Sequence, residues 1–419
     1  MRRLKRMLTG MAFTMMILMS AGCGEEKIIS EDYQIGNSHH RYANAVMKTD
    51  TGFYYSQGDY GWLSLHYYDA ANGKNMYLCN KPECRHEGDE FCVATSEKYM
   101  VFDTILYSNC LYINVIEPTD SAYEYKLLRA SLDGSSLEEV VTYLTVNKVE
   151  IVPDTNPMII HRNKAFLPYV VKNVNNQQIG YNGVAIYDLE TGEVTYLGDK
   201  EGDLKVEKTN FCGYGDYMYF VTAEKYKKRL CRYSYADGGV EELSLERNFS
   251  GDYAIYDDDT IYFMRGNSEL FIHNPQTGEN TSVSVEEWYG IRTGENSSSR
   301  SGFCDLVSDG KYLYIGENGF LKSFSTTSVW IGGMEDGSDL DFMEISILDG
   351  EGNLVNEIRF SPKDVLGYRE CFLLHFCGET IYMQTPKMMY ECTREDFVAG
   401  EPEFKEVYPI DIRLLSIGG

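Results

Sequence analysis

The sequence predicts an all-β protein that folds as a single β-propeller, and three observations support this. Short strands with alternating apolar and polar residues recur along the chain, turns rich in Gly, Asp and Asn separate them, and no helical periodicity longer than two turns follows the N-terminal apolar segment. The number of repeats predicts seven four-stranded blades. A six-bladed ring with one irregular unit and a pair of β-sandwiches are the alternatives.

The first repeated unit is a polar turn followed by an apolar–Tyr–apolar strand. It recurs at a spacing of roughly 45–70 residues, close to the length of a propeller blade. Its seven copies lie at residues 49–57, 107–115, 161–171, 213–222, 256–265, 308–317 and 376–385. Seven blades of four strands would use most of the chain, and closing them into a ring would protect the sheet edges.

The second repeated unit is a strand, a polar turn and another strand. Pairs such as Asp-Gly, Asn-Gly and Thr-Gly in these turns supply the left-handed conformations that close hairpins. The copies lie at residues 65–78, 127–141, 184–197, 230–243, 270–283 and 345–358. Each copy usually follows a copy of the first unit, so together they predict the four strands of one blade.

The N-terminal residues have the layout of a secretory signal. Four basic residues precede an uncharged, mostly apolar run from Met7 to Gly22, which is short for a membrane span. Residues 20–23, Ser-Ala-Gly-Cys, resemble a lipobox, although Ser20 stands where leucine is usual. We therefore expect a signal peptide at residues 1–22, a lipid on Cys23, a polar tether at 23–40 and the propeller at 41–419. An ordinary signal peptide and an uncleaved anchor are the alternatives.

The mature chain is strongly acidic. Cleavage before Cys23 removes four of the 38 Lys and Arg residues and leaves 34 against 64 Asp and Glu, a net charge of −30. Such a surface repels nucleic acid, which we exclude as a partner, and it repels anionic lipid, so we expect contact with the membrane only through the lipid anchor. Hydrophobic residues make up 43% of the chain, enough for a large core.

Three cysteines and one histidine are concentrated between Cys79 and Cys92. The spacing is Cys79-x4-Cys84-x-His86-x5-Cys92. Three thiolates and an imidazole form a sound tetrahedral set for a structural zinc ion, with no open position for catalysis. A disulfide among the three cysteines, and unlinked thiols, are the alternatives. Because the loop is polar and cannot hold itself together by burial, we expect a covalent or metal staple. The remaining cysteines are scattered singly, as buried free thiols are.

The lipobox, the LCNKPECRH run at 78–86 and the tyrosine-rich hairpins together resemble uncharacterised β-propeller lipoproteins of Gram-positive gut clostridia. The hairpins also resemble YWTD-like and TolB-like propellers. The resemblance covers nearly the whole mature chain. It implies a propeller at the cell surface, and it implies no established activity and no catalytic residues.

Other patterns carry less chemistry. No G-x-S-x-G, H-E-x-x-H or P-loop motif occurs, and the Asp257–Asp259 run falls where other repeats have a plain turn. The four histidines at 66, 161, 273 and 375 lie in or beside strand patterns, as packed histidines do. Two irregular stretches, 286–302 and 324–341, interrupt the repeat. Their exposed-contact candidates, suited to stacking on sugars or docking a peptide, are Trp288, Tyr289, Arg292 and Trp330.

These observations predict a binding or scaffolding module anchored to the outer face of a bacterial cell membrane. Its ligand would be a protein or a carbohydrate. An enzyme acting on surface polysaccharide or peptide is the first alternative, and a structural subunit of an envelope complex is the second. The sequence favours a protein without catalytic activity, because no nucleophile, base or paired acids can be singled out among its 64 acidic residues.

Overall fold

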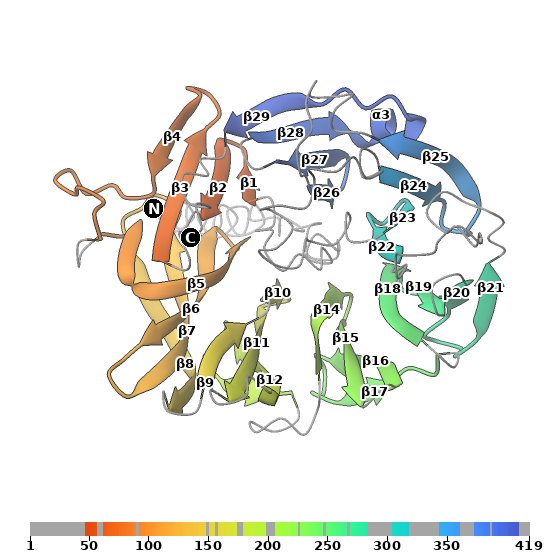
Figure 1. The fold of residues 1–419 in the computed structure, drawn as a ribbon, viewed down its shortest axis with the longest axis horizontal. Coiled ribbons are helices and arrows are strands. Elements are labelled where there is room, and N and C mark those ends of the chain that lie inside the picture. The colour runs from red at the N-terminus through yellow and green to blue at the C-terminus, as the bar shows by residue number, and fades with distance from the viewer. Residues whose placement is uncertain are drawn as a thin grey trace, which may run out of the picture.

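The chain folds into antiparallel sheets that follow one another around a ring (Figure 1). The structure is a computed structural model. It describes residues 47–56, 62–88, 92–147, 151–155, 158–173, 179–197, 206–224, 227–245, 249–265, 269–283, 304–317, 343–360, 373–385 and 388–409. This arrangement is a single all-β propeller, as the sequence predicts.

The first eight strands form one continuous sheet. Its strands are β1 (Met47–Thr49), β2 (Gly52–Ser56), β3 (Trp62–Asp69), β4 (Lys74–Tyr77), β5 (Thr95–Tyr107), β6 (Cys110–Pro118), β7 (Ala122–Ser131) and β8 (Leu137–Asn147). The order is β1-β2-β3-β5-β6-β7-β8, with β4 paired to β3. Two four-stranded meanders are therefore joined into one sheet through β3 and β5.

The remaining strands form five separate sheets. The first has five strands: β9 (Ile151–Thr155), β10 (Ile159–His161), β11 (Lys164–Asn173), β12 (Ile179–Asp188) and β13 (Val194–Tyr196). The next two have four strands each: β14 (Val206–Tyr214), β15 (Tyr217–Glu224), β16 (Lys227–Ser234) and β17 (Val240–Glu242), then β18 (Phe249–Asp257), β19 (Thr260–Arg265), β20 (Glu269–His273) and β21 (Asn280–Val283).

The last two sheets also have four strands each. They contain β22 (Cys304–Ser308), β23 (Leu313–Glu317), β24 (Met343–Leu348) and β25 (Leu354–Phe360), then β26 (Leu373–Cys377), β27 (Thr380–Gln384), β28 (Met388–Thr393) and β29 (Lys405–Pro409). A short helix, α3 (Arg394–Ala399), connects β28 to β29. Thr393 caps its first turn, and Gly400 ends it in a left-handed conformation.

The prediction of seven separate four-stranded blades, and of six in the alternative, needs correction. Five sheets are separate blades, and strands β1–β8 form one sheet. The physical reason is the length of β5. Its first part pairs with β3 (Ser64 with Thr95), and its second part pairs with β6 (Tyr107 with Cys110). Because one edge of β3 serves both β4 and β5, the two meanders share hydrogen bonds that hairpin spacing does not reveal.

Both repeated units predicted from the sequence are hairpins in the structure. The seven copies of the first unit join the first two strands of each four-strand meander. The copies of the second unit join the third and fourth strands. In all six of the latter, an Asp or Asn side chain accepts a backbone N–H, and a left-handed glycine lies in the same turn. These pairs are Asp69 and Gly73, Asp133 and Gly134, Asp188 and Gly192, Asp237 and Gly238, Asn274 and Gly278, and Asp349 and Gly352.

The hydrophobic core lies between successive meanders and not at one centre. Leu63, Leu65 and Val93 pack against Leu111 and Ile113 between the two halves of the eight-stranded sheet. The other clusters repeat this arrangement between each meander and the next. A last cluster packs β2 against the sheet β26–β29, which Figure 1 shows side by side. Flat sheets packed face to face bury their apolar faces on their neighbours.

Candidate metal centre

The cysteine–histidine run lies on the connection between β4 and β5, at the place where both strands share the edge of β3. Leu65 of β3 holds both ends of this connection: its carbonyl accepts from the N–H of Leu78 at 3.0 Å, and its own N–H donates to the carbonyl of Ala94 at 2.7 Å. Leu78, Val93 and Ala94 are buried. The two ends of the loop are therefore fixed, and the polar residues between them project from a rigid base.

A proline turn sets the separation of the first two cysteines. The N–H of Cys84 donates to the carbonyl of Lys81 at 3.1 Å, which closes a four-residue turn with Pro82 at its second position. Proline is favoured there because its ring fixes φ at the value that the turn requires. This turn brings Cys84 back toward Cys79.

A left-handed residue resolves the tight spacing between Cys84 and His86. His86 has φ 59°, and Gly88 has φ 85°. A left-handed residue reverses the chain locally, so that the imidazole can reach the same point as the thiol two residues earlier. The N–H of Gly88 then donates to Thr95 Oγ1 at 3.1 Å, which connects the loop to the start of β5.

The structure brings together the four residues that the sequence singled out. One ligand atom from each of Cys79, Cys84, His86 and Cys92 lies within 4.8 Å of all the others. His86 Nδ1 is 3.5 Å from Cys92 Sγ. Sulfurs around one tetrahedral zinc ion lie about 3.8 Å apart, because each Zn–S bond is about 2.3 Å long. A contraction of about 1 Å at most would therefore place four donors around one ion.

Hydrogen-bond donors surround the three sulfurs. Cys92 Sγ accepts from the N–H and the hydroxyl of Thr95 at 3.3 and 3.2 Å. Cys79 accepts from the N–H groups of Lys81 and Val93. Cys84 accepts from the N–H of His86. Because donors aimed at sulfur stabilise the thiolate form, and metals bind thiolates, this shell suits a metal ligand set.

The thiols of the cluster compete for negative charge. Burial opposes ionisation of Cys79, yet the surrounding hydrogen bonds hold its pKa below the ordinary value. The N–H of His86 acts in the same direction on Cys84, but burial and the neighbouring thiols of Cys92 and Cys79 raise the pKa of Cys84 to about 11. One thiolate thus suppresses ionisation of the next, and a bound cation would relieve this repulsion.

Cys79 and Cys92 of the cluster are free thiols in the structure. The scattered thiols at 110, 212, 231, 377 and 392 are free as expected. Cys212, Cys231 and Cys392 are buried among apolar residues, where thiols behave as small hydrophobes.

A neighbouring hairpin supports the loop, and the sequence did not reveal this contact. The N–H of Asn80 donates to the carbonyl of Gly134, in the turn between β7 and β8, at 3.2 Å. Gly134 has φ 69°, and a Cβ there would lie 2.8 Å from the backbone nitrogen of Cys79. Only glycine fits so close an approach in that conformation. Gly134 and Thr95 thus position the cluster without belonging to it.

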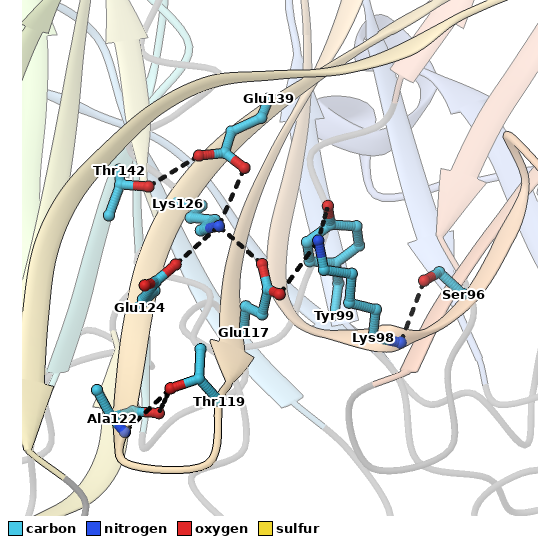
Figure 2. Close-up of polar contacts among 10 residues, drawn as sticks. All are labelled: Ser96, Lys98, Tyr99, Glu117, Thr119, Ala122, Glu124, Lys126, Glu139 and Thr142. Atoms are coloured by element: carbon cyan, nitrogen blue, oxygen red, sulfur yellow. Dashed lines mark hydrogen bonds and ion pairs between the residues drawn. The ribbon is translucent and has the colours of Figure 1, made fainter. Parts of the chain in front are cut away.

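Figure 2 shows a second charged cluster, across strands β5 to β8. Lys126 Nζ lies 2.7 Å from Glu117, 2.9 Å from Glu124 and 3.0 Å from Glu139, and Lys98 Nζ lies 3.1 Å from Glu117. Burial alone would lower the pKa of Lys126, but the three carboxylates raise it. Since lysines already pair with these carboxylates, the cluster ties four strands together and offers no general acid or base.

The other sequence-derived candidates divide into two groups. Cys23, the tether, and the contact residues Trp288, Tyr289, Arg292 and Trp330 lie outside the described residues. The Asp257–Asp259 run forms the plain β18–β19 hairpin turn that was expected, with the N–H of Asp259 donating to Asp257. His66, His161, His273 and His375 all lie on strands. Burial lowers the pKa of His375 to about 4, which suits a packed neutral imidazole.

No known protein family and no curated protein matches the sequence of this chain. Solved propeller structures resemble its fold at low identity. The computationally designed Ika8 protein has 8% identity and a TM-score of 0.46, with 88% of this chain and 86% of that one covered. Virginiamycin B lyase from Staphylococcus aureus has 12% identity, a TM-score of 0.40 and coverages of 76% and 86%. BamB from Moraxella catarrhalis has 11% identity and a TM-score of 0.39, with 82% of this chain and 91% of that one covered.

The described part of the chain holds no helix of the length and apolar character that a bilayer crossing requires.

Proposed function

We propose that this protein is a lipid-anchored, extracytoplasmic β-propeller that works as a binding or scaffolding module. Its first two meanders would be joined by a structural zinc ion on Cys79, Cys84, His86 and Cys92. The observation that carries this proposal is the completeness of the four-donor set. Four protein ligands fill a tetrahedral coordination sphere, so the ion has no position for substrate or for a reactive water. Among the described residues, the cysteine–histidine cluster therefore supports a structural role and not a catalytic one.

The donor types favour zinc over other cations. Calcium and magnesium prefer carboxylate and carbonyl oxygens, and the cluster offers sulfur and one imidazole nitrogen. The site joins two strands that share one edge of β3, and its polar loop has little apolar surface to bury. An ion there would fix the crossover between the two halves of the eight-stranded sheet.

The blade count enters the proposal in a modified form. We propose that the two meanders of the eight-stranded sheet occupy two positions of a seven-position ring. The support is the packing. Seven hydrophobic clusters occur among the described residues, each between one four-strand meander and the next. Side-chain packing then sets the number of positions in the ring, while the hydrogen bonds between β3 and β5 join the first two meanders into one sheet.

Location and anchoring rest on the sequence. The Ala-Gly-Cys triplet that ends the apolar run supports a lipid on Cys23 and placement on the outer face of the bacterial membrane. The resemblance to clostridial propeller lipoproteins points to the same location. Wild-type protein should sediment with membranes, whereas Cys23→Ser should be released in folded form. Retention of this variant in the membrane fraction would contradict lipid anchoring.

Metal analysis of the detergent-extracted full chain tests the zinc centre. We expect about one zinc per chain in the wild type, as structural four-ligand sites hold. The metal should be lost in His86→Ala and in Cys84→Ser. Cys110→Ser is the matched control, because Cys110 is a free thiol outside the cluster, and it should keep the metal. Wild type without bound metal would refute the centre.

Cobalt substitution tests whether the site is structural. Co²⁺ in a closed tetrahedral thiolate site should give an absorption spectrum that added azide or phosphate leaves unchanged. A spectrum that shifts with these ligands would reveal an open coordination position. That result would replace the structural interpretation with a catalytic one.

A further inference from the structure

The ring closes between its last and first sheets through side chains. In the described residues each sheet uses strands that are consecutive in sequence, so no strand from one end of the chain is added to the sheet at the other end. The closing seam is instead the packing of Phe53 and Tyr55 on β2 against Tyr382, Met389 and Tyr408 on β27 to β29. We call this cluster the closing seam. Figure 1 shows these two sheets side by side.

Polar contacts between described residues also cross the closing seam. Lys48 Nζ donates to Tyr382 OH at 3.0 Å and lies 3.9 Å from a carboxylate oxygen of Glu391. Asn75 Nδ2 on β4 donates to the carbonyl of Pro409 at the end of β29 at 3.3 Å. Like the seams between the other separate sheets, the closing seam is held by side chains without a shared hydrogen-bonded strand, so the ring can open there locally.

A column of aromatic rings connects the closing seam to the cysteine–histidine cluster. Tyr408 lies 5.5 Å from Tyr55 between ring centroids, with the rings at 20°. Tyr55 lies 5.1 Å from His66 at 10°. His66 lies 4.7 Å from Tyr77 with the rings tilted at 35°, and Tyr77 lies 4.8 Å from His86 at 29°. The ring of His86 is thus both a candidate metal ligand and the outer end of this column.

The column depends on support at its outer end. Tyr77 is 44% exposed and belongs to the outermost strand β4, so water could replace one of its neighbours. On its inner side it packs at a tilt against His66, which Ser64 Oγ holds by a hydrogen bond of 2.9 Å to Nε2. On its outer side is His86, whose loop is polar. An imidazole whose Nδ1 binds a metal has a fixed ring plane, and such a plane gives Tyr77 a rigid surface to stack on.

We propose that the metal centre controls the closing seam: ion binding fixes the His86 ring, and the aromatic column transmits this order to Tyr55 and Tyr408. This regulation rests on the proposed zinc centre and deepens it. With the metal bound, the seam is closed and β29 is docked. Without it, the polar loop frays, Tyr77 loses its outer support, and the seam opens locally more often while the rest of the ring stays folded.

Hydrogen exchange of the full chain, with zinc bound and after removal by a chelator, tests this coupling. Metal removal should accelerate amide exchange about 3- to 10-fold in residues 50–56 and 403–409, the effect of losing one stacked aromatic contact. Residues 304–317 and 373–376 belong to the seam between the last two sheets and serve as an internal reference. Their exchange should not change.

Two variants separate coupling from metal binding. Tyr77→Leu removes the stacking ring and no metal ligand, so it should keep its zinc while seam exchange becomes fast with or without the metal. Met76→Leu is the matched control, since Met76 is also 44% exposed on β4 and lies outside the column. It should behave as wild type does.

The outcomes distinguish the two proposals. Zinc that is present and removable, with no change in seam exchange, would overturn the coupling and leave the zinc centre standing. Wild-type response in Tyr77→Leu would show that the column does not carry the effect, and would also overturn the coupling. A protein that binds no zinc would overturn both.

Discussion

Lys126→Met removes a buried ammonium from the centre of three carboxylates. The side chain of Lys126 is 7% exposed, and its Nζ lies within 3.0 Å of Glu117, Glu124 and Glu139. Methionine preserves much of the volume and the apolar stem. The substitution therefore tests the charge and its hydrogen bonds more than the packing.

The expected loss of stability follows from where the carboxylates lie. Removing one partner of a fully buried ion pair costs about 3–5 kcal/mol, because the other charge stays buried and unpaired. Here Glu124 and Glu139 are 32% and 40% exposed and can turn toward water, and Lys98 still pairs with Glu117. We therefore expect a decrease of about 2 kcal/mol in the free energy of unfolding at pH 7.

Denaturant unfolding followed by tryptophan fluorescence would measure this loss. Arg129→Met is the matched control, because Arg129 lies on the same strand and pairs with Glu138, but both side chains are more than 40% exposed. Exposed pairs contribute about 0–1 kcal/mol. If Lys126→Met destabilised the protein no more than Arg129→Met does, the argument from buried charge would be wrong.

The penalty should also depend on pH. The pKa of Glu139 is lowered: burial opposes this, but the hydrogen bonds from Lys126 and Thr142 outweigh it. Its pairing therefore stabilises the fold above the unfolded-state pKa of about 4.5, and this contribution is lost as the pH falls through the lower folded-state pKa. The gap between Lys126→Met and wild type should narrow below about pH 4. A constant gap from pH 7 to pH 3 would contradict this linkage.

Three further predictions follow from single positions. Burial raises the pKa of Asp103 to about 7. An acid with a raised folded-state pKa stabilises the fold most below its unfolded-state pKa of 3.8, and this contribution is lost as the pH rises to about 7. In unfolding measured across that pH window, the free energy of unfolding of the wild type should therefore fall by roughly a few kcal/mol relative to that of Asp103→Asn. Gly134→Ala should cost about 2 kcal/mol in unfolding free energy, against about 1 kcal/mol for Gly278→Ala, because both have positive φ but only Gly134 faces nearby backbone; equal losses would refute the steric argument. Cys84→Ser should raise protease cleavage within residues 80–88 and leave the melting temperature within about 5 °C, since a loop change of this kind acts locally; a larger fall would mean that the whole ring depends on the loop.

The sequence by itself determined the strands, the turns and the proximity of the three cysteines and the histidine. Alternation of apolar residues and fixed turn chemistry are local properties, so each predicted hairpin is present in the structure. Cys79, Cys84, His86 and Cys92 lie within fourteen residues, so a short loop was bound to keep them close. The same cluster also indicated a metal site or a disulfide, because thiols and an imidazole concentrated in one loop have few other roles.

Tertiary structure decided how these units join. The double sheet arises because β5 is long enough to pair with β3 before it pairs with β6, and edge sharing between strands leaves no periodic signal. Gly134 lies 42 to 55 residues from the cluster in sequence and supports it across a contact that only the packed hairpin creates. The helix α3 also escaped the sequence analysis, because six residues are too few to show a helical period.

The aromatic column shows the same division most clearly. Tyr55, His66 and Tyr77 each occupy an ordinary strand position, and alternation alone predicts only which face each shares with its neighbours. Stacking of Tyr55 on Tyr408 needs the first and last sheets to meet, which happens only when the ring closes. Local patterns therefore specify the strands and the cysteine–histidine cluster, whereas the contact of Tyr55 with Tyr408 depends on the closed ring, because it joins residues that are far apart in the chain.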